Sequence, residues 1–241
     1  MTVTRAGRPR LTSQRRPGTT ARDEILDAAG ELFTTTGYTG TSTRTIAEAV
    51  GIRQASLYHY YKTKDDILCA LLSQTVIPTL SFIPNLETAE PALSAQEHLH
   101  ALAAFDGRQL LDGRWNLGAL YLQPELRGDG LEPFWSDRER LRLHYLEVSQ
   151  AIVTETGVDA VAAELPFRLV ESLVNTRADR TDDRTGLPMH VADACVRVLG
   201  LPDADTSALR ASSSRVLAGY GLASSEENLI ANHGLRPPAR S

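Results

Sequence analysis

The sequence has little of several residue types that mark particular protein classes. Its 241 residues include only two cysteines and two lysines, and aromatic side chains make up 6% of the chain. Cys69 and Cys195 lie far apart and form neither a CxxC pair nor a cysteine–histidine metal-ligand spacing. The sequence therefore predicts neither a disulfide framework nor a zinc site, and we interpret both thiols as small buried side chains.

Long apolar runs are also missing. No stretch approaches the roughly 20 apolar residues that a membrane-spanning helix needs, and no apolar run follows the first arginines as it does in a secretory signal. With 42% hydrophobic residues, the chain is long enough to bury a core in one large domain or two smaller ones. We therefore expect a soluble, cytoplasmic protein with no membrane partner.

Short motifs of common enzyme and cofactor sites do not occur. The sequence contains no GxSxG, P-loop, HExxH or GxGxxG pattern. His98 and His100 would point to different sides of a helix, and the other histidines show no metal-ligand spacing. Asp182 and Asp183 lie in a polar stretch that is typical of a solvated turn. We predict no catalytic activity, no cofactor and no metal site.

Positive charge is concentrated near the start of the sequence. Residues 1–64 carry ten Lys and Arg against five Asp and Glu, a net charge of +5, whereas the remainder has a net charge of −10. A basic head on an acidic body indicates that the head meets a polyanion. Residues 1–22 contain six arginines and no acid, with many Pro, Gly, Ser and Thr residues, which predicts a flexible basic arm over residues 1–19. A solvated tail is the alternative.

Four helical patterns follow this arm. Apolar spacing predicts helices over residues 20–37, 43–51, 53–61 and 64–76, the first two capped by the threonines at which they begin. A short helix, a glycine turn and another short helix form the helix-turn-helix plan, in which the second helix enters the DNA major groove.

The helix expected over residues 53–61 has a small, polar outward face. With Leu57 directed to the core and about 100° per residue, Arg53, Tyr60 and Tyr61 lie on the core side. The residues that point away are Ala55, Ser56, Tyr58, His59 and Lys62. Such a face allows close approach to a groove, with hydrogen-bonding groups beside it and basic or phenolic groups for phosphates at its edges.

Residues 20–76 resemble the DNA-binding domain of TetR-type bacterial transcriptional regulators. The resemblance is carried by the run "ILDAAGELFTTTGYTGTSTRTIAEAVGIRQASLYHYYKTKDDIL", which has both glycine turns, "LYHYY" and the Lys64–Asp65 helix start in order. It implies an all-α fold, with an N-terminal three-helix helix-turn-helix domain and a larger helical domain for ligand binding and dimerisation. This chain has Arg53 where the family often has Ser or Thr, and Gln54 where Lys is common.

The resemblance also implies roles for individual residues. Those expected on phosphates are Thr43, Arg44, Tyr58 and Lys64, and those expected on bases are Gln54, Ala55, Ser56 and His59. A glutamine can pair with adenine, and an alanine can contact a thymine methyl group. For Tyr58 and His59 the alternative is a position on a merely solvated face.

The arm contains the sequence Gly-Arg-Pro-Arg at residues 7–10. Arg8 and Arg10 suit insertion into a narrow A·T minor groove, where the negative potential is enhanced. Attraction to phosphates without sequence reading is the alternative.

The larger part of the chain follows. We expect the DNA-binding domain over residues 20–77, a helical body over 78–222 and a tail over 223–241. Helical patterns in the body occur at about 94–112, 114–123, 133–156, 160–178, 188–200 and 206–220. The proline-containing stretch 77–93 is expected to be a connection that can include short helical turns. Candidate ligand-pocket residues are Phe105, Trp115, Tyr121 and Tyr145. Filling of an ordinary core is the alternative for most of these aromatic side chains.

The helices expected at 160–178 and 188–200 are apolar on more than one face. The interface candidates are Leu165, Leu169, Leu173, Val191, Cys195, Val196 and Leu199. A helix that is apolar on two sides must bury both, so we predict a homodimer whose two heads read a palindromic operator. The family resemblance points to the same two helices. The alternative is that the helix at 206–220 covers the second side.

These features predict a sequence-specific transcriptional regulator of double-stranded DNA. We expect a repressor that a small-molecule effector releases from its operator. The alternative is a ligand-independent or architectural DNA-binding protein, which would release DNA with salt but with no metabolite.

Overall fold

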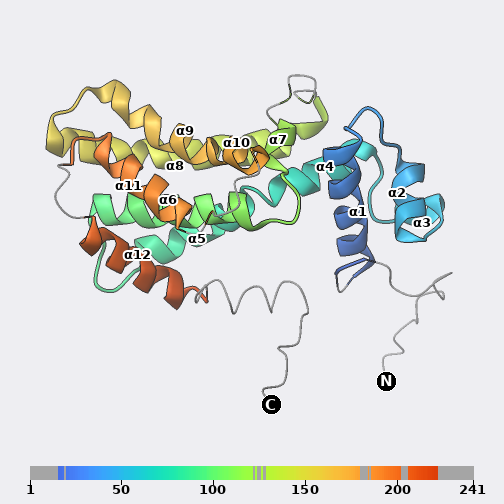
Figure 1. Cartoon of the computed structure of the whole chain (residues 1–241), viewed down its shortest axis with the longest axis horizontal. Helices are drawn as coiled ribbons and strands as arrows, with labels where there is room; N and C mark the ends of the chain where they lie inside the picture. Colours follow the sequence, from blue (N-terminus) through green and yellow to red (C-terminus); the bar gives the residue numbers. More distant parts are fainter. Residues whose placement is uncertain are drawn as a thin grey trace, which may run out of the picture. The chain divides into compact units, whose positions relative to one another are not determined.

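The computed structural model describes residues 16–18, 20–121, 123, 126, 129–179, 184, 186–201 and 206–221. All regular secondary structure in these ranges is helical and none is strand, which confirms the predicted all-α fold (Figure 1). The chain divides into two compact units, between Leu71 and Leu72. The arginines at positions 8 and 10 and the predicted tail at 223–241 lie outside the described residues.

The first unit is a small helical domain. It contains α1 (Ala21–Thr35), α2 (Thr43–Val50), α3 (Gln54–Leu57) and most of α4 (Lys64–Ser73). Thr20 caps α1 as predicted, and the Asp23 side chain bonds back to the Thr20 backbone in a capping box. The core is formed by Ile25, Ala28, Phe33, Ile46, Leu57, Ile67 and Leu68.

Two details of this unit differ from the prediction. The N-cap of α2 is Ser42, whose hydroxyl accepts from the backbone N–H of Thr45, so the expectation that Thr43 caps this helix is wrong. The third helix ends at Leu57 instead of residue 61. Beyond it the backbone forms tight turns, because the N–H groups of Tyr60 and Tyr61 both bond to the carbonyl of Leu57.

Because α3 ends at Leu57, helical spacing does not correctly predict which of the residues after it are buried. Arg53 is on the surface and Tyr60 is 44% exposed, although both were expected to face the core. Tyr61 is buried as expected. Arg22 donates to its hydroxyl at 3.1 Å and lies over its ring, 4.9 Å from the centroid.

The second unit is a larger helical bundle. Its elements are α5 (Ile77–Glu87), α6 (Ala95–Asp112), α7 (Gly118–Tyr121), η2 (Asp129–Leu131), α8 (Glu132–Thr156), η3 (Ala160–Glu164), α9 (Leu165–Glu171), α10 (Leu173–Ala178), α11 (Leu187–Arg197) and α12 (Ser207–Gly219). Helix α6 is central and packs against α5, α8, α9, α11 and α12 (Figure 1). The single pattern expected at 160–178 is divided into η3, α9 and α10.

Residues 77–87 of the connection expected at 77–93 form helix α5, whereas residues 88–93 contain no helix. Pro78 lies in the first turn of α5, where a backbone N–H has no helical partner, and buried Phe82 and Leu86 anchor the helix. Contrary to the prediction, the stretch Lys64–Glu87 is long and apolar enough to cross a membrane by these two criteria alone. Core helices of soluble proteins pass the same two criteria, and 44% of the most apolar window of this stretch is buried inside the protein.

Four of the residues predicted for a dimer interface lie inside the bundle. Leu173, Cys195, Val196 and Leu199 are at most 1% exposed. Helix α11 packs against α6 and α9, and α10, which begins at Leu173, packs against α6 and α7, so the chain's own helices already cover these side chains. Helix α12, the alternative cover, packs against α6. Only Leu165, Leu169 and Val191 remain at least partly exposed.

Candidate nucleic-acid interface

The connection between α2 and α3 sets the angle of the helix-turn-helix. Gly51 adopts φ 78° and ψ 29°, a left-handed conformation that favours glycine. The N–H of Ile52 bonds to the carbonyl of Ala47 at 3.0 Å and closes the turn. Leu57 is fully buried and anchors α3. The four residues of α3 are therefore held by the turn and one apolar side chain.

Three predicted contact residues meet in a small surface cluster. The Gln54 amide donates to the Thr43 hydroxyl at 2.9 Å and to the Tyr58 hydroxyl at 3.3 Å. The hydroxyls of Thr43 and Tyr58 are 3.1 Å apart. We call Thr43, Gln54 and Tyr58 the hydroxyl–amide cluster. It joins the start of α2 to α3 and presents polar atoms at the surface.

The other predicted contacts are at the surface of the same unit. Arg44 forms an ion pair of 2.9 Å with Glu48, one turn along α2. Ala55, His59 and Lys62 are exposed and Ser56 is partly exposed. Exposed Tyr60 lies beside these residues in the chain, although its spacing had assigned it to the core. The roles of these side chains on DNA stay predictions.

Lys64 has a different environment from that of a simple phosphate contact. Its ammonium donates to the carbonyls of Tyr38 and Thr41 at 2.8 and 2.9 Å. It also lies 4.0 Å from the centroid of the Tyr38 ring, whose hydroxyl bonds to Asp65. Lys64 therefore ties α4 to the loop before α2, and only part of its donor capacity is left for phosphate.

Arg16 anchors the segment before α1. Its guanidinium pairs with Asp27 at 2.9 Å and with Glu31 at 2.6 Å, and its Nε donates to the Ala49 carbonyl at 3.2 Å. Sequence composition had assigned this residue to the flexible arm. Asp27 and Glu31 lie one helical turn apart, so one basic side chain can pair with both of them. This spacing is visible in the sequence, but amino-acid composition does not contain it.

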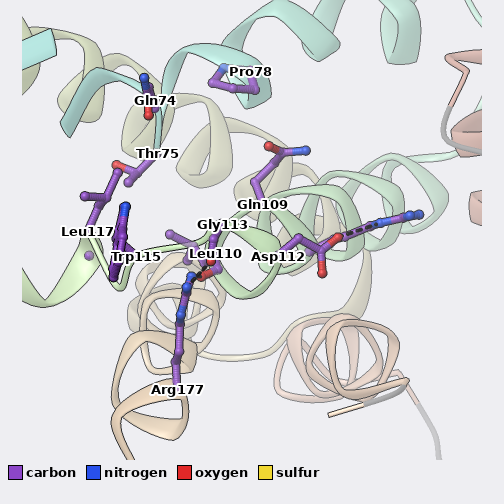
Figure 2. A pocket seen from close by; sticks show the side chains of 12 residues that line it. Gln74, Thr75, Pro78, Gln109, Leu110, Asp112, Gly113, Trp115, Leu117 and Arg177 are labelled. Atoms are coloured by element: carbon purple, nitrogen blue, oxygen red, sulfur yellow. Dashed lines mark hydrogen bonds and ion pairs between the residues drawn. The ribbon is translucent and has the colours of Figure 1, made fainter. Parts of the chain in front are cut away.

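A pocket opens in the second unit. It has a volume of about 320 Å³, at the low end for small-molecule sites. Its lining includes Gln74, Thr75, Pro78, Arg108, Gln109, Leu110, Asp112, Gly113, Trp115, Leu117, Gly118 and Arg177 (Figure 2). Arg108 pairs with Asp112 at 3.1 Å, and Arg177 donates to the carbonyls of Leu110 and Gly113. The pocket mixes apolar walls with amide, carboxylate and guanidinium groups.

The four predicted pocket residues are not brought together. Trp115 lines the pocket just described. Tyr121 borders a separate cavity of about 10 Å³. Phe105 stacks on Phe82 with ring centroids 4.2 Å apart, and Tyr145 is fully buried. The last two aromatic side chains thus fill the core.

A buried carboxyl group borders the small cavity. Asp106 accepts from the hydroxyls of Thr79 at 2.9 Å and Tyr145 at 3.0 Å. Burial raises the pKa of Asp106 to about 7, although both hydrogen bonds act in the opposite direction. Nearby, Arg138 pairs with Glu171, and its guanidinium lies over the ring of Phe167 at 5.0 Å from the centroid. Sequence periodicity alone did not single out this network.

Three helices also share a buried serine–histidine–aspartate arrangement. His100 lies 2.7 Å from the Ser213 hydroxyl and 3.0 Å from the Asp193 carboxylate, which Arg210 also binds. Burial tends to raise the pKa of Asp193, but hydrogen bonds from Arg210 and His100 outweigh it and hold the value at about 2. Ser213 and His100 are fully buried, so the hydroxyl does not face a substrate. The arrangement joins α6, α11 and α12.

Comparisons with known proteins place these features in context. Residues 25–71 match the family described as bacterial regulatory proteins, tetR family. The fatty acid metabolism regulator protein of Bacillus subtilis (strain 168) is 32% identical over 161 residues, which cover 66% of this chain and 79% of that protein. Mycobacterium smegmatis AmtR superposes with a TM-score of 0.77 at 46% identity, covering 94% of this chain and 100% of that chain.

A further solved structure contains a ligand. The transcriptional regulator FadR from Bacillus subtilis, in complex with stearoyl-CoA, superposes with a TM-score of 0.52 at 23% identity, covering 73% of this chain and 96% of that chain. At this level of identity the likeness concerns the fold alone.

Proposed function

The chain belongs to the tetR family of bacterial regulatory proteins, and from this premise we propose that it is a repressor that binds a palindromic operator as a homodimer. A small-molecule effector in the helical body releases it from the DNA. The observation that carries this proposal is the hydroxyl–amide cluster, which presents polar groups of α2 and α3 together on an exposed surface. In this arrangement α3 enters the major groove and the start of α2 meets the backbone.

Charge supports the same orientation. Residues 1–64 have a net charge of +5. Two of the acids in this range, Asp27 on α1 and Glu48 on α2, form ion pairs with Arg16 and Arg44. The exposed Lys62 and His59 lie beside the recognition segment. Basic groups at the edge of a recognition element attract phosphates without reading sequence.

The homodimer is supported by apolar side chains that the chain itself leaves uncovered. Val161 in η3 is 73% exposed and Leu165 at the start of α9 is 44% exposed. Leu169, one turn further along, is partly exposed. Apolar groups at this spacing suit a helical interface with a second copy, which would place two recognition segments on one operator.

We propose that the effector is a compact molecule with both apolar and polar groups. The 320 Å³ pocket offers the Trp115 ring, the Gln74 and Gln109 amides and the Arg177 guanidinium (Figure 2). The inner cavity beside Asp106 has a volume of only about 10 Å³. A long acyl chain, as in the FadR complex, would need a much larger opening of this bundle than a compact ligand does.

Selection from a random pool of double-stranded DNA tests the DNA-binding half of the proposal. We expect enrichment of a sequence with two inverted half-sites. Gln54→Ala should change the preferred base in each half-site, whereas Tyr58→Phe should weaken binding to all sequences alike. Enrichment of no sequence would favour the architectural alternative.

Fluorescence tests the effector half. In a Trp135→Phe background, Trp115 is the remaining tryptophan and reports on the pocket. Compact metabolites that shift its emission should also release the selected operator at constant salt. If compounds that bind at Trp115 leave operator affinity unchanged, this pocket is not the effector site.

A further inference from the structure

Helices α6 and α8 bring two histidines together that the sequence separates. The Nε2 atoms of His98 and His144 lie 3.0 Å apart, with ring centroids at 5.1 Å and ring planes tilted by 46°. One imidazole donates and the other accepts in this contact. Sequence spacing had excluded the histidines as joint ligands, but spacing reports only on ligands within one element.

The separation of the two nitrogens fits coordination of one ion. Two imidazole nitrogens at about 2.0–2.1 Å from a zinc ion lie roughly 3 Å apart in tetrahedral or more compact geometry. The lone pair of the accepting ring is directed at the N–H of the other ring. A small rotation of both rings would direct both lone pairs to a shared ion, with each ring then carrying its proton on Nδ1.

Two glutamates lie near His144. Glu147 lies three residues after His144, on the same face of α8, and Glu87 is the last residue of α5. Burial lowers the pKa of His144, and the negative charges of Glu87 and Glu147 oppose this lowering. Both glutamates are exposed, so their side chains have room to reorient.

We propose that His98 and His144 form a site for a divalent transition-metal ion such as Zn²⁺, with Glu147 or Glu87 and water in the remaining positions. Imidazole suits Zn²⁺, Ni²⁺ and Cu²⁺, and a carboxylate oxygen is a common third ligand of zinc. In the part of the chain that the structure describes, no three His, Cys, Asp or Glu side chains are already gathered for a metal. The ion would therefore assemble its third protein ligand on binding.

Binding would replace one hydrogen bond by two metal–ligand bonds that join α6 to α8. An ion that binds only the folded chain raises its stability by mass action. The proposal is independent of the operator and of the effector, so neither result in the DNA experiments decides it.

Calorimetric titration of the full chain with Zn²⁺ tests the site, with any purification tag removed. We expect one ion per protomer, and at least tenfold weaker binding in His98→Gln and His144→Gln. The matched control is His190→Gln, because His190 is exposed and its Nδ1 lies 2.9 Å from the carbonyl oxygen of Gly186, the N-cap of α11. Equal Zn²⁺ affinity in the wild type and the double glutamine variant would overturn the proposal.

Electron paramagnetic resonance of the wild type gives a readout that does not depend on how the variants fold. With one equivalent of Cu²⁺ we expect hyperfine splitting from two imidazole nitrogens. Splitting from one nitrogen or none would show that the pair is only a hydrogen bond between two helices.

Discussion

The two lysines of the chain have different surroundings. Lys62 is exposed, whereas Lys64 donates to the Tyr38 and Thr41 carbonyls and lies over the Tyr38 ring. A charged donor on two carbonyls contributes more to folding than an exposed one. Although the two lysines are close in sequence, Lys64 therefore stabilises the fold, whereas Lys62 is a surface residue.

Replacement of each lysine by methionine should separate these roles. Lys64→Met should lower the free energy of unfolding by about 1–2 kcal/mol, because two charged hydrogen bonds are removed. Lys62→Met should leave stability unchanged and reduce the slope of log K against log salt by about 0.9, as expected when one phosphate is no longer neutralised. Urea unfolding and anisotropy at several salt concentrations measure both. A stable Lys64→Met variant would show that the bonds from Lys64 to the loop contribute little.

Asp106 makes stability depend on pH. Its pKa is about 7 in the folded chain against an ordinary value of 3.8, and burial is the main cause. Between these values the folded state holds a proton that the unfolded state has released. The free energy of unfolding therefore falls as pH rises from about 4 to 7.

Asp106→Asn should remove this contribution. Relative to the wild type, the variant should gain stability on going from pH 5 to pH 8, by up to a few kcal/mol at about 1.4 kcal/mol per pKa unit. Urea unfolding at four pH values measures the difference, and exposed Asp112→Asn is the control. Parallel curves for the wild type and Asp106→Asn would mean that the carboxyl group titrates normally.

At the scale of elements, neighbouring residues at the start of α2 have separate tasks. Ser42 caps the helix by accepting from the Thr45 N–H at 3.1 Å. Thr43, the next residue, bonds instead to Gln54 and Tyr58 at the recognition segment. The cap stabilises α2 itself, while the adjacent hydroxyl faces the proposed DNA contact.

A pair of alanine variants tests this division. Ser42→Ala should lower the free energy of unfolding by about 1 kcal/mol, the usual effect of removing an N-cap. Thr43→Ala should change stability less and weaken binding to all DNA sequences, as expected for a phosphate contact. Thermal unfolding and anisotropy measure the two effects. If Thr43→Ala lowered stability more than Ser42→Ala did, Thr43 would be the residue that stabilises the start of α2.

At the scale of the whole molecule, the dimer should depend on exposed residues and not on those that fill the bundle. Leu165→Asp with Leu169→Asp should give a folded monomer that no longer binds a palindrome tightly. Leu173→Asp should unfold the second unit, because a charge would replace a fully buried side chain. Analytical ultracentrifugation with circular dichroism distinguishes the two outcomes. A dimer that persists in the double variant would place the interface elsewhere.

Removal of residues 1–15 tests the predicted arm while keeping the Arg16 anchor, which bonds to α1 and α2. The truncated protein should bind DNA more weakly and with a smaller salt slope, by about 0.9 for each phosphate that the arm neutralises. Thermal unfolding should be unchanged. An unaltered salt slope would show that these residues do not touch DNA.

Much of the fold follows from local sequence signals. Helical spacing predicted α6, α8, α11 and α12 to within a few residues, and the Thr20 cap and the glycine turns marked the first unit. The predictions were wrong for α3, whose four residues are too few to show a helical period, and for α5, whose prolines suggested a connection. Pro78 is compatible with α5 because the first turn of a helix needs no N–H from it.

The sequence by itself determined the family, the helical class and the basic head, because spacing, caps and charge are properties of neighbouring residues. Tertiary structure alone decided which apolar faces are covered, as with Val196 on α11, which packs against α6 and α9, and which polar groups meet. His98 and His144 are one such pair, and Arg16 with Ala49 is another. These pairs join residues far apart in the chain. Their partners are set by how helices pack, which no local pattern encodes.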